Sequence, residues 1–327
     1  MGNVFILGNG VDLDLGLPTK YSDFAKSSFW PKASPQPSLR ASSGNVLRVS
    51  SINPILLEHY LEKKKNLDSW FDLENELLLY SCVENKRNGK ESNSFIKKNV
   101  EYYNKLQSSL CEYILDVEGK TTLKNCFASK VLKSIIDNGY FDQIYSFNYT
   151  NLNKIAQLLN IYHEINYVHL HGKVEDKSII LGVDDSELRP GYEQFHKSSS
   201  RHYRSHDIYN ALTNAQEIVI FGLSFGNIDY SYFDRFFRSL SDGDSILEEK
   251  KKNITIFTKD DNSRLGIIGK LREMKIGIQR LYAQSHFQII CTNDERDNAL
   301  LDTFVKRMHD TSRAAYEQAL DNLSTVF

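Results

Sequence analysis

The chain opens with a short apolar run followed at once by two glycines, a pattern that narrows the folds it can adopt. Residues 4–7 (Val-Phe-Ile-Leu) are too few for a helix and are bounded by glycines, which indicates a buried strand. Gly8 and Gly10 flank Asn9, so the backbone can turn sharply and approach a ligand closely with free N–H groups. Thr19 can then cap a following helix. The opening is therefore typical of the first strand and nucleotide-binding loop of an α/β domain.

This loop departs from the usual dinucleotide-binding fingerprint. In G-x-G-x-x-G the third glycine would stand at position 13, where this chain has Leu13. The strand that should follow about twenty residues later and end in an acidic ribose ligand is also missing. The loop by itself fits either a nucleotide site or a tight turn between a strand and a helix.

Further strand patterns follow, and helical patterns separate them. The expected strands cover residues 143–147, 166–170, 179–181, 217–221, 254–257 and 287–290, with helices near 54–65, 70–83, 92–116, 124–138 and 295–323. Short apolar strands that alternate with helices favour a mostly parallel sheet with helices on both faces. We therefore predict one Rossmann-like α/β domain over residues 1–327. A proline-rich loop and a helical insertion, together residues 31–140, interrupt it after the first strand.

Small and polar residues follow five of the expected strands. They are Asn9, Gly10 and Asp12; Asn148, Tyr149 and Thr150; His171 and Gly172; Asp184 and Asp185; and Gly222, Ser224, Phe225 and Asp229. Ligands of open parallel sheets bind beyond the carboxyl ends of the strands, so these residues are expected to meet in one site. Turns between strands and helices use the same residue types as caps, which is the alternative explanation.

A carboxylate in the segment that begins at Trp70 is a further candidate. In a helix, Glu74 shares a face with Trp70 and Leu77, and burial on that face would raise its pKa and suit it to catalysis. A stripe rotated through Leu73 and Tyr80 would instead leave Glu74 at its edge. The sequence favours neither arrangement.

Histidines occur in two groups. His169 and His171 alternate, so both would face one side of a strand, but no third ligand with suitable spacing accompanies them and we expect no metal. The second group consists of His196, His202 and His206, accompanied by Arg201 and Arg204. It fits either a phosphate-contacting patch or an exposed polar helix.

Composition argues for a cytoplasmic protein. The formal net charge of -2 gives no general bias toward nucleic acid or membrane surfaces. The four cysteines lie far apart without a C-x-x-C pair, which favours reduced thiols and argues against a zinc module. No targeting pattern and no apolar run of about 18 residues is present.

These motifs resemble those of the AbiH family of bacterial phage abortive-infection proteins. The matching segments are Ile6-Leu-Gly-Asn-Gly-Val-Asp12, residues 16–24, 70–74 and 146–150, His169-Leu-His-Gly172, and residues 221–224 followed by Asp229. More distantly, their order resembles the sirtuin-like NAD-binding fold. In that resemblance Gly8-Asn9-Gly10 corresponds to the G-A-G loop, Asn148 to the asparagine of the T-Q-N-x-D segment, His171 to the catalytic histidine of the H-G segment, and Gly222 and Ser224 to the last, G-T/L-S segment.

The chain departs from the sirtuin pattern in two ways. It lacks the four-cysteine zinc module, which argues against protein deacetylation. Thr150 stands where the pattern has an aspartate, which removes a polar partner of the nicotinamide amide unless Asp12 or Glu74 substitutes for it.

The resemblance implies an anti-phage effector that binds NAD and hydrolyses it to nicotinamide and ADP-ribose. The expected catalytic residues are His171, Asn148, Asp12 and Glu74, and the expected NAD-binding residues are Gly8, Asn9, Gly10, Asp12, Tyr149, Gly172, Gly222, Ser224 and Asp229. We expect no prosthetic group. A non-catalytic NAD or nucleotide sensor is the alternative, followed by an effector that acts on another nucleotide or on nucleic acid. The sequence does not decide whether a phage protein triggers this effector or whether the chain associates with copies of itself.

Overall fold

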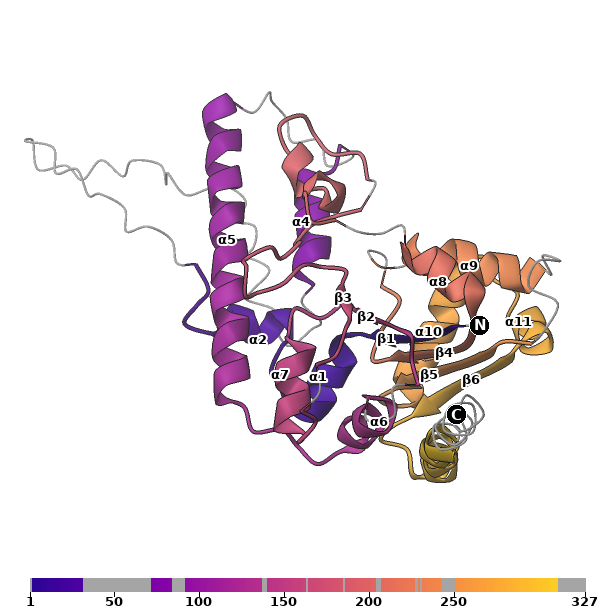
Figure 1. The fold of residues 1–327 in the computed structure, drawn as a ribbon. Helices are drawn as coiled ribbons and strands as arrows, with labels where there is room; N and C mark the ends of the chain where they lie inside the picture. Colours follow the sequence, from indigo (N-terminus) through magenta and orange to yellow (C-terminus); the bar gives the residue numbers. More distant parts are fainter. Residues whose placement is uncertain are drawn as a thin grey trace, which may run out of the picture. The chain divides into compact units, whose positions relative to one another are not determined.

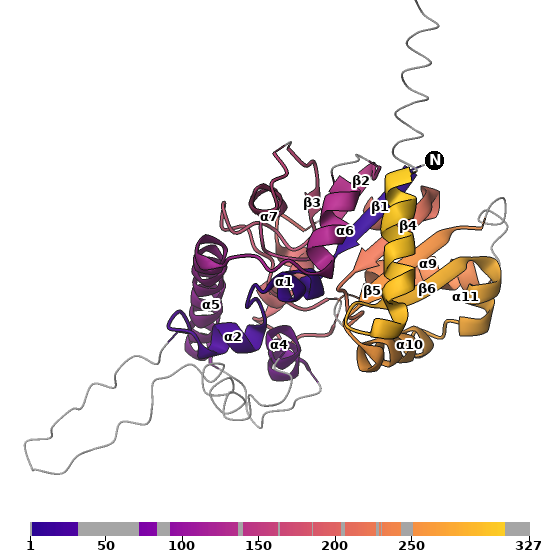
Figure 2. The same cartoon turned by 90° about the horizontal axis from the view of Figure 1, so that it is seen from below.

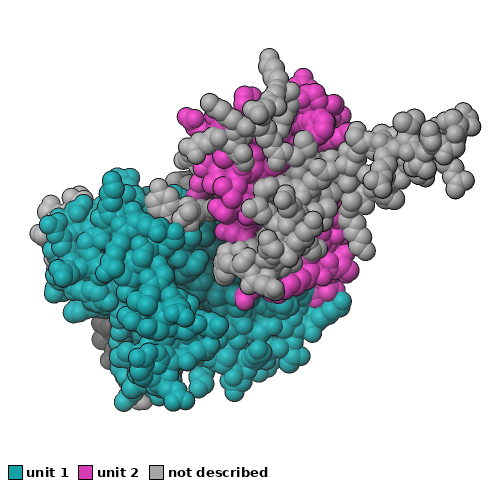
Figure 3. Space-filling model, turned by 180° about the vertical axis from the view of Figure 1, so that it is seen from behind, with its two compact units in different colours: residues 1–19, 117–173, 204–327 teal, residues 20–116, 174–203 magenta. Residues whose placement is uncertain are grey.

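The computed structural model describes residues 2–31, 72–83, 92–136, 140–162, 164–184, 186–203, 207–226, 229, 231–242 and 251–310. The chain divides into two compact units, coloured separately in Figure 3. The sheet unit consists of residues 1–19, 117–173 and 204–327, and the helical unit of residues 20–116 and 174–203. The helical unit thus takes in residues 174–203 in addition to much of the predicted insertion.

The sheet unit is built on six strands. They are β1 (Gly2–Leu7), β2 (Gln143–Ser146), β3 (Val168–His169), β4 (Ala215–Phe221), β5 (Asn253–Thr258) and β6 (His286–Cys291). Their order is β3-β2-β1-β4-β5-β6, and every neighbouring pair is parallel. This confirms the predicted Rossmann-like parallel sheet. The strand order reverses between β1 and β4, where ligands of such sheets bind.

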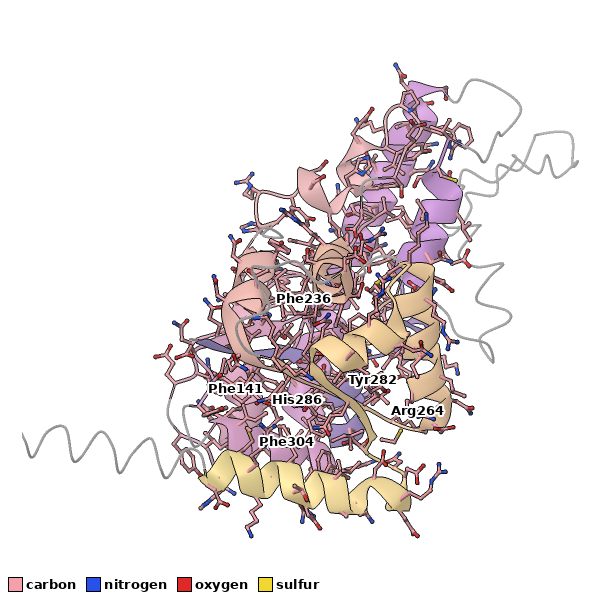
Figure 4. The ribbon with its side chains drawn as sticks, turned by 90° about the vertical axis from the view of Figure 1, so that its right-hand side faces the viewer. Phe141, Phe236, Arg264, Tyr282, His286 and Phe304 are labelled. Carbon is pink, nitrogen blue, oxygen red and sulfur yellow. The ribbon has the colours of Figure 1, made fainter. Side chains whose placement is uncertain are left out.

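Helices cover both faces of this sheet. They are α1 (Asn9–Leu15), α6 (Phe127–Ile136), α7 (Leu152–Leu158), α8 (Asp207–Asn214), α9 (Ser231–Asp242), α10 (Asp261–Glu273), α11 (Ile278–Gln284) and a helix over residues 298–310. Helices α8 and α9 lie on one side of the sheet, and α6 and the 298–310 helix lie side by side on the other (Figures 1 and 2). Phe236 of α9 and Phe304 of the last helix accordingly lie on opposite sides (Figure 4). The predicted helices on both faces are confirmed.

The helical unit contains α2 (Tyr21–Lys26), α4 (Leu73–Ser81), most of α5 (Asn93–Lys120), and the short helices η1 (Glu193–Phe195) and η2 (Lys197–Ser199). A buried amide joins three of its segments. Asn99 donates hydrogen bonds to the hydroxyls of Tyr80, at 2.9 Å, and Tyr192, at 2.7 Å. None of the helices described in either unit is long and apolar enough to cross a membrane.

One predicted strand is wrong. Residues 179–181 are buried but form no strand and belong to the helical unit, where Leu181 accepts a hydrogen bond from the Tyr103 hydroxyl. The apolar run is explained by burial alone, because the Leu181 carbonyl bonds to a side chain and not to a neighbouring strand. Asp184 therefore follows no strand of the sheet. The predictions for residues 32–71, including Trp70, for Asp185, for Arg204 and His206, and for residues 311–323 lie outside the described residues.

Candidate functional site

The loops that follow β1 and β4 contact each other backbone against backbone. Gly8 donates its N–H to the carbonyl of Phe221 and Gly10 donates to that of Gly222, both at 2.8 Å. A Cβ on Gly10 would lie 2.6 Å from the Gly222 Cα, and Gly222 itself has a φ of +73°. Glycine is required at these positions because no side chain fits between the loops.

This contact corrects one expectation from the sequence. The N–H groups of Gly8 and Gly10 are not free for a ligand, because protein carbonyls already occupy them. Within the described part of the chain, the Asn9 N–H has no hydrogen-bond partner. The Asn9 side chain is held by Thr19, whose hydroxyl donates to Asn9 Oδ1 at 2.5 Å. The loop therefore offers Asn9, and not the two glycines, as a backbone donor.

Asp12 lies in α1, directly beyond β1, and its carboxyl group is buried. Thr150 Oγ1 donates to Asp12 Oδ2 at 2.9 Å, and Asn148 Nδ2 donates to Asp12 Oδ1 at 2.9 Å. Burial raises the pKa of Asp12 to about 7, because desolvation of the carboxylate outweighs the hydrogen bonds that favour it, chiefly those of Thr150 and Asn148; the nearby Glu118 adds to the rise. This carboxyl group can therefore take up or release a proton near neutral pH.

Asn148 follows β2 and is held in a tight turn. Its backbone N–H donates to Ser146 Oγ at 3.2 Å, and its side chain is 6% exposed. Among the described residues, its Oδ1 atom is buried and has no hydrogen-bond partner. A buried acceptor without a donor is costly, so this atom is available to a hydroxyl, an N–H group or a water that enters the site.

His171 follows β3 and lies next to the Asn148 turn. Its Nε2 atom is 3.6 Å from Oδ1 of Asp229, which follows β4. Its ring packs against Phe147 and Tyr149, the two neighbours of Asn148, at centroid distances of 5.3 and 6.3 Å. The side chains that follow β2, β3 and β4 thus gather around one buried imidazole.

The loop after β4 contains a strained residue at the same edge. Phe225 has a φ of +53°, a left-handed conformation that costs free energy for any residue other than glycine, and its side chain is fully buried against Phe233. Ser224 beside it is exposed, and Gly172 after His171 also has a positive φ of +77°. Strained backbone of this kind often occurs at functional sites.

The structure places most of the predicted site residues at one edge of the sheet unit. Gly8, Asn9, Gly10, Asp12, Asn148, Tyr149, His171, Gly172, Gly222, Ser224 and Asp229 all follow the carboxyl ends of β1, β2, β3 or β4. We call this set the carboxyl-edge cluster. Its geometry agrees with a shared site, and the individual ligand contacts remain predictions.

A family model described as "Bacteriophage abortive infection AbiH" matches residues 4–247. The chain belongs to the AbiH family. The match includes the whole carboxyl-edge cluster, from Gly8 to Asp229. A solved structure titled "Crystal structure of a Sir2 homolog-NAD complex" is similar at 10% sequence identity and a TM-score of 0.36, covering 94% of this chain and 90% of that one. No curated protein matches the sequence.

Glu74 has partners in the helical unit of this AbiH family member. Its Oε1 atom accepts the Gly182 N–H at 3.0 Å and lies 3.6 Å from Nζ of Lys197. Both charged side chains are buried, and the pair connects α4 to the segment before and after η1. These contacts give the buried carboxylate a structural explanation, while its catalytic role remains a prediction.

Two residues have roles that sequence reasoning missed. Thr150, interpreted as a lost aspartate, donates its hydroxyl to Asp12, so the buried carboxyl group of α1 lies beside it. His169 bonds to the carbonyl of Asn148 through Nδ1, at 3.2 Å, and to the Tyr167 hydroxyl through Nε2, at 2.8 Å. Across the described ranges, no group of three or more His, Cys, Asp or Glu side chains could hold a metal ion. The alternation of the two histidines was the signal that could have drawn attention to His169.

Proposed function

We propose that this AbiH family member binds NAD, or a closely related nucleotide, at the carboxyl-edge cluster and hydrolyses its nicotinamide–ribose bond during the abortive-infection response. One observation carries the proposal. A buried carboxyl group that titrates near neutral pH, Asp12, is bonded to Asn148 beside the pair formed by His171 and Asp229. The site lies where the strand order of a parallel sheet reverses, which is where nucleotides bind in this fold class.

Cleavage of the nicotinamide–ribose bond develops positive charge on the ribose. An ionised Asp12 carboxylate, 1% exposed, stabilises such charge more strongly than it could in water. The unfilled Oδ1 acceptor of Asn148 orients a ribose hydroxyl or the attacking water. Asp12 thus stabilises the developing charge, and Asn148 positions the reacting group.

The water that attacks the ribose must lose a proton. His171 accepts this proton, and the Asp229 carboxylate 3.6 Å away stabilises the resulting imidazolium. NAD and one water molecule thus give nicotinamide, ADP-ribose and a proton, with no change in oxidation state. The Asn9 N–H and the exposed Ser224 hydroxyl are the donors for the pyrophosphate.

A non-catalytic nucleotide sensor is the second candidate, and one observation favours it. Both carboxyl oxygens of Asp12 already accept hydrogen bonds, from Thr150 and Asn148. A carboxyl group engaged in this way can shape a binding site without taking part in chemistry.

The test is incubation of the purified protein with NAD and chromatographic separation of the products. His171→Ala and Asn148→Ala should each lower turnover at least about 100-fold, the usual contribution of a general base or a positioning group. The matched controls are His286→Ala and Asn298→Ala, which remove exposed side chains of the same types. Both controls should retain wild-type turnover. Full turnover by the two site variants would refute the assignment.

A titration calorimetry experiment separates the two candidates. NAD binding without turnover, weakened by Asn148→Ala but not by Asn298→Ala, would select the sensor. Absence of binding to NAD, NADP and ATP alike would contradict a nucleotide site at the carboxyl-edge cluster.

A further inference from the structure

We propose that His169 is a positioning residue that fixes the turn carrying Asn148, and this inference rests on the proposed function. His169 ends β3, is 7% exposed and lies two residues before His171. Its two ring nitrogens bond to a backbone carbonyl and to a tyrosine hydroxyl. The two histidines at this end of β3 therefore have different roles. His171 acts as the general base, and His169 holds the Asn148 turn in place.

The contact of Nδ1 determines the tautomer of His169. The Asn148 carbonyl, 3.2 Å away, can only accept a hydrogen bond, so Nδ1 must carry the hydrogen. In the neutral ring Nε2 is then an acceptor, and the Tyr167 hydroxyl donates to it at 2.8 Å. Because protein groups engage both nitrogens, His169 does not serve as a metal ligand in this arrangement.

The same tyrosine connects this chain of hydrogen bonds to the start of α7. The Tyr167 oxygen accepts the N–H of Leu152, the first residue of α7, at 3.0 Å. The turn from Asn148 to Leu152 is thus supported from one side by His169 of β3 and by Tyr167, which precedes the strand. Asn148 and Thr150, which both bond to Asp12, lie within this turn.

The two ring nitrogens of His169 therefore have different functions. The Nδ1–H group holds the carbonyl of the residue that orients the substrate, whereas Nε2 bonds to Tyr167. Loss of the Nδ1 donor should let the Asn148 turn shift. A displacement of about 1 Å at a positioning group lowers turnover by up to about 100-fold.

Two substitutions separate these functions. In His169→Asn, the amide Nδ2 can take the place of Nδ1, so the bond to the Asn148 carbonyl is kept. In His169→Gln, the longer side chain places its amide near the Nε2 position, so the carbonyl loses the imidazole donor and keeps the longer bond from Ser146 Oγ, at 3.4 Å. We expect His169→Asn to keep kcat within about 3-fold of wild type and His169→Gln to lose about 10- to 100-fold, with KM for NAD changed much less.

Hydrogen exchange without NAD gives a readout that does not depend on turnover. Peptides that span the turn from Asn148 to Leu152 should exchange faster in His169→Gln than in wild type, and at the wild-type rate in His169→Asn. Equal kcat losses in both variants, or equal exchange in all three proteins, would overturn the inference. If the wild type does not hydrolyse NAD, the proposed function fails, and the exchange pattern alone still decides the role of His169.

A measurement on the wild type needs no folded variant. Nitrogen-15 spectra of the histidine rings should show His169 as the Nδ1–H tautomer. The Nε2–H tautomer would overturn the inference, because Nδ1 could then not donate to the Asn148 carbonyl.

Discussion

Asp12 makes the free energy of unfolding depend on pH in a way that one substitution should remove. Burial raises its pKa from the ordinary value of 3.8 to about 7. At about 1.4 kcal/mol per pH unit, this rise corresponds to about 4 kcal/mol between the protonated and ionised forms. The side chain is almost completely buried, so solvent screening does not reduce this figure.

The direction of the effect follows from proton binding. The folded protein holds the Asp12 proton more tightly than the unfolded chain does, so it carries more protons between about pH 4 and pH 7. The stability that the protonated group contributes is fully present below about pH 4 and is lost as the pH rises through about 7. Asp12→Asn cannot ionise, so its stability relative to wild type should rise by about 3 kcal/mol from pH 5 to pH 8.

Urea unfolding followed by circular dichroism at these two pH values measures the difference. Asp302→Asn is the matched control, since Asp302 is exposed on the 298–310 helix and should follow wild type at both pH values. If Asp12→Asn also followed wild type within about 0.5 kcal/mol, burial would not hold the Asp12 proton and the reasoning would be refuted.

Two further predictions concern the same edge of the sheet. Thr150→Val removes a hydroxyl whose hydrogen bond lowers the pKa of Asp12, so that pKa should rise. The pH at which NAD turnover is half-maximal should then move upward, and an unchanged pH–rate profile would contradict the role of Asp12. Gly222→Ala should destabilise the protein by more than about 2 kcal/mol, because a Cβ would lie 2.6 Å from the Gly10 Cα and φ is positive. Gly269→Ala, in the open middle of α10, should instead stabilise it by about 0.5 to 1 kcal/mol, and equal melting temperatures for the two variants would show this explanation to be wrong.

The sheet could be predicted because its central strands are continuous apolar runs. Residues 217–221 are all buried in β4, as expected for a strand covered on both faces. The same signal failed at residues 179–181, which are equally buried but pack in the helical unit. Hydrophobicity reports burial, and it does not report which group accepts the backbone hydrogen bonds.

The membership of the carboxyl-edge cluster was predictable, but its internal bonds were not. The parallel-sheet rule brings Asp12 and Asn148 to one edge because each follows a strand. Asp12 and Thr150 are 138 residues apart in the sequence, and only the folded structure shows that the threonine hydroxyl donates to the carboxylate. The sequence also could not show that the N–H groups of Gly8 and Gly10 bond to carbonyls at the end of β4 and just after it, because glycine lets either a ligand or another backbone segment approach closely.

The division of the chain into units sets an order for folding during synthesis. All residues of the helical unit have been made once residue 203 is added, whereas β1 can pair with β2 earlier but gains its second neighbour, β4, only when the chain from Ala215 onward is made. Domains tend to fold as their chain emerges from the ribosome. The carboxyl-edge cluster cannot be complete until Asp229 has been translated, so a nascent or prematurely terminated chain that ends before this residue lacks the carboxylate that lies 3.6 Å from His171 Nε2.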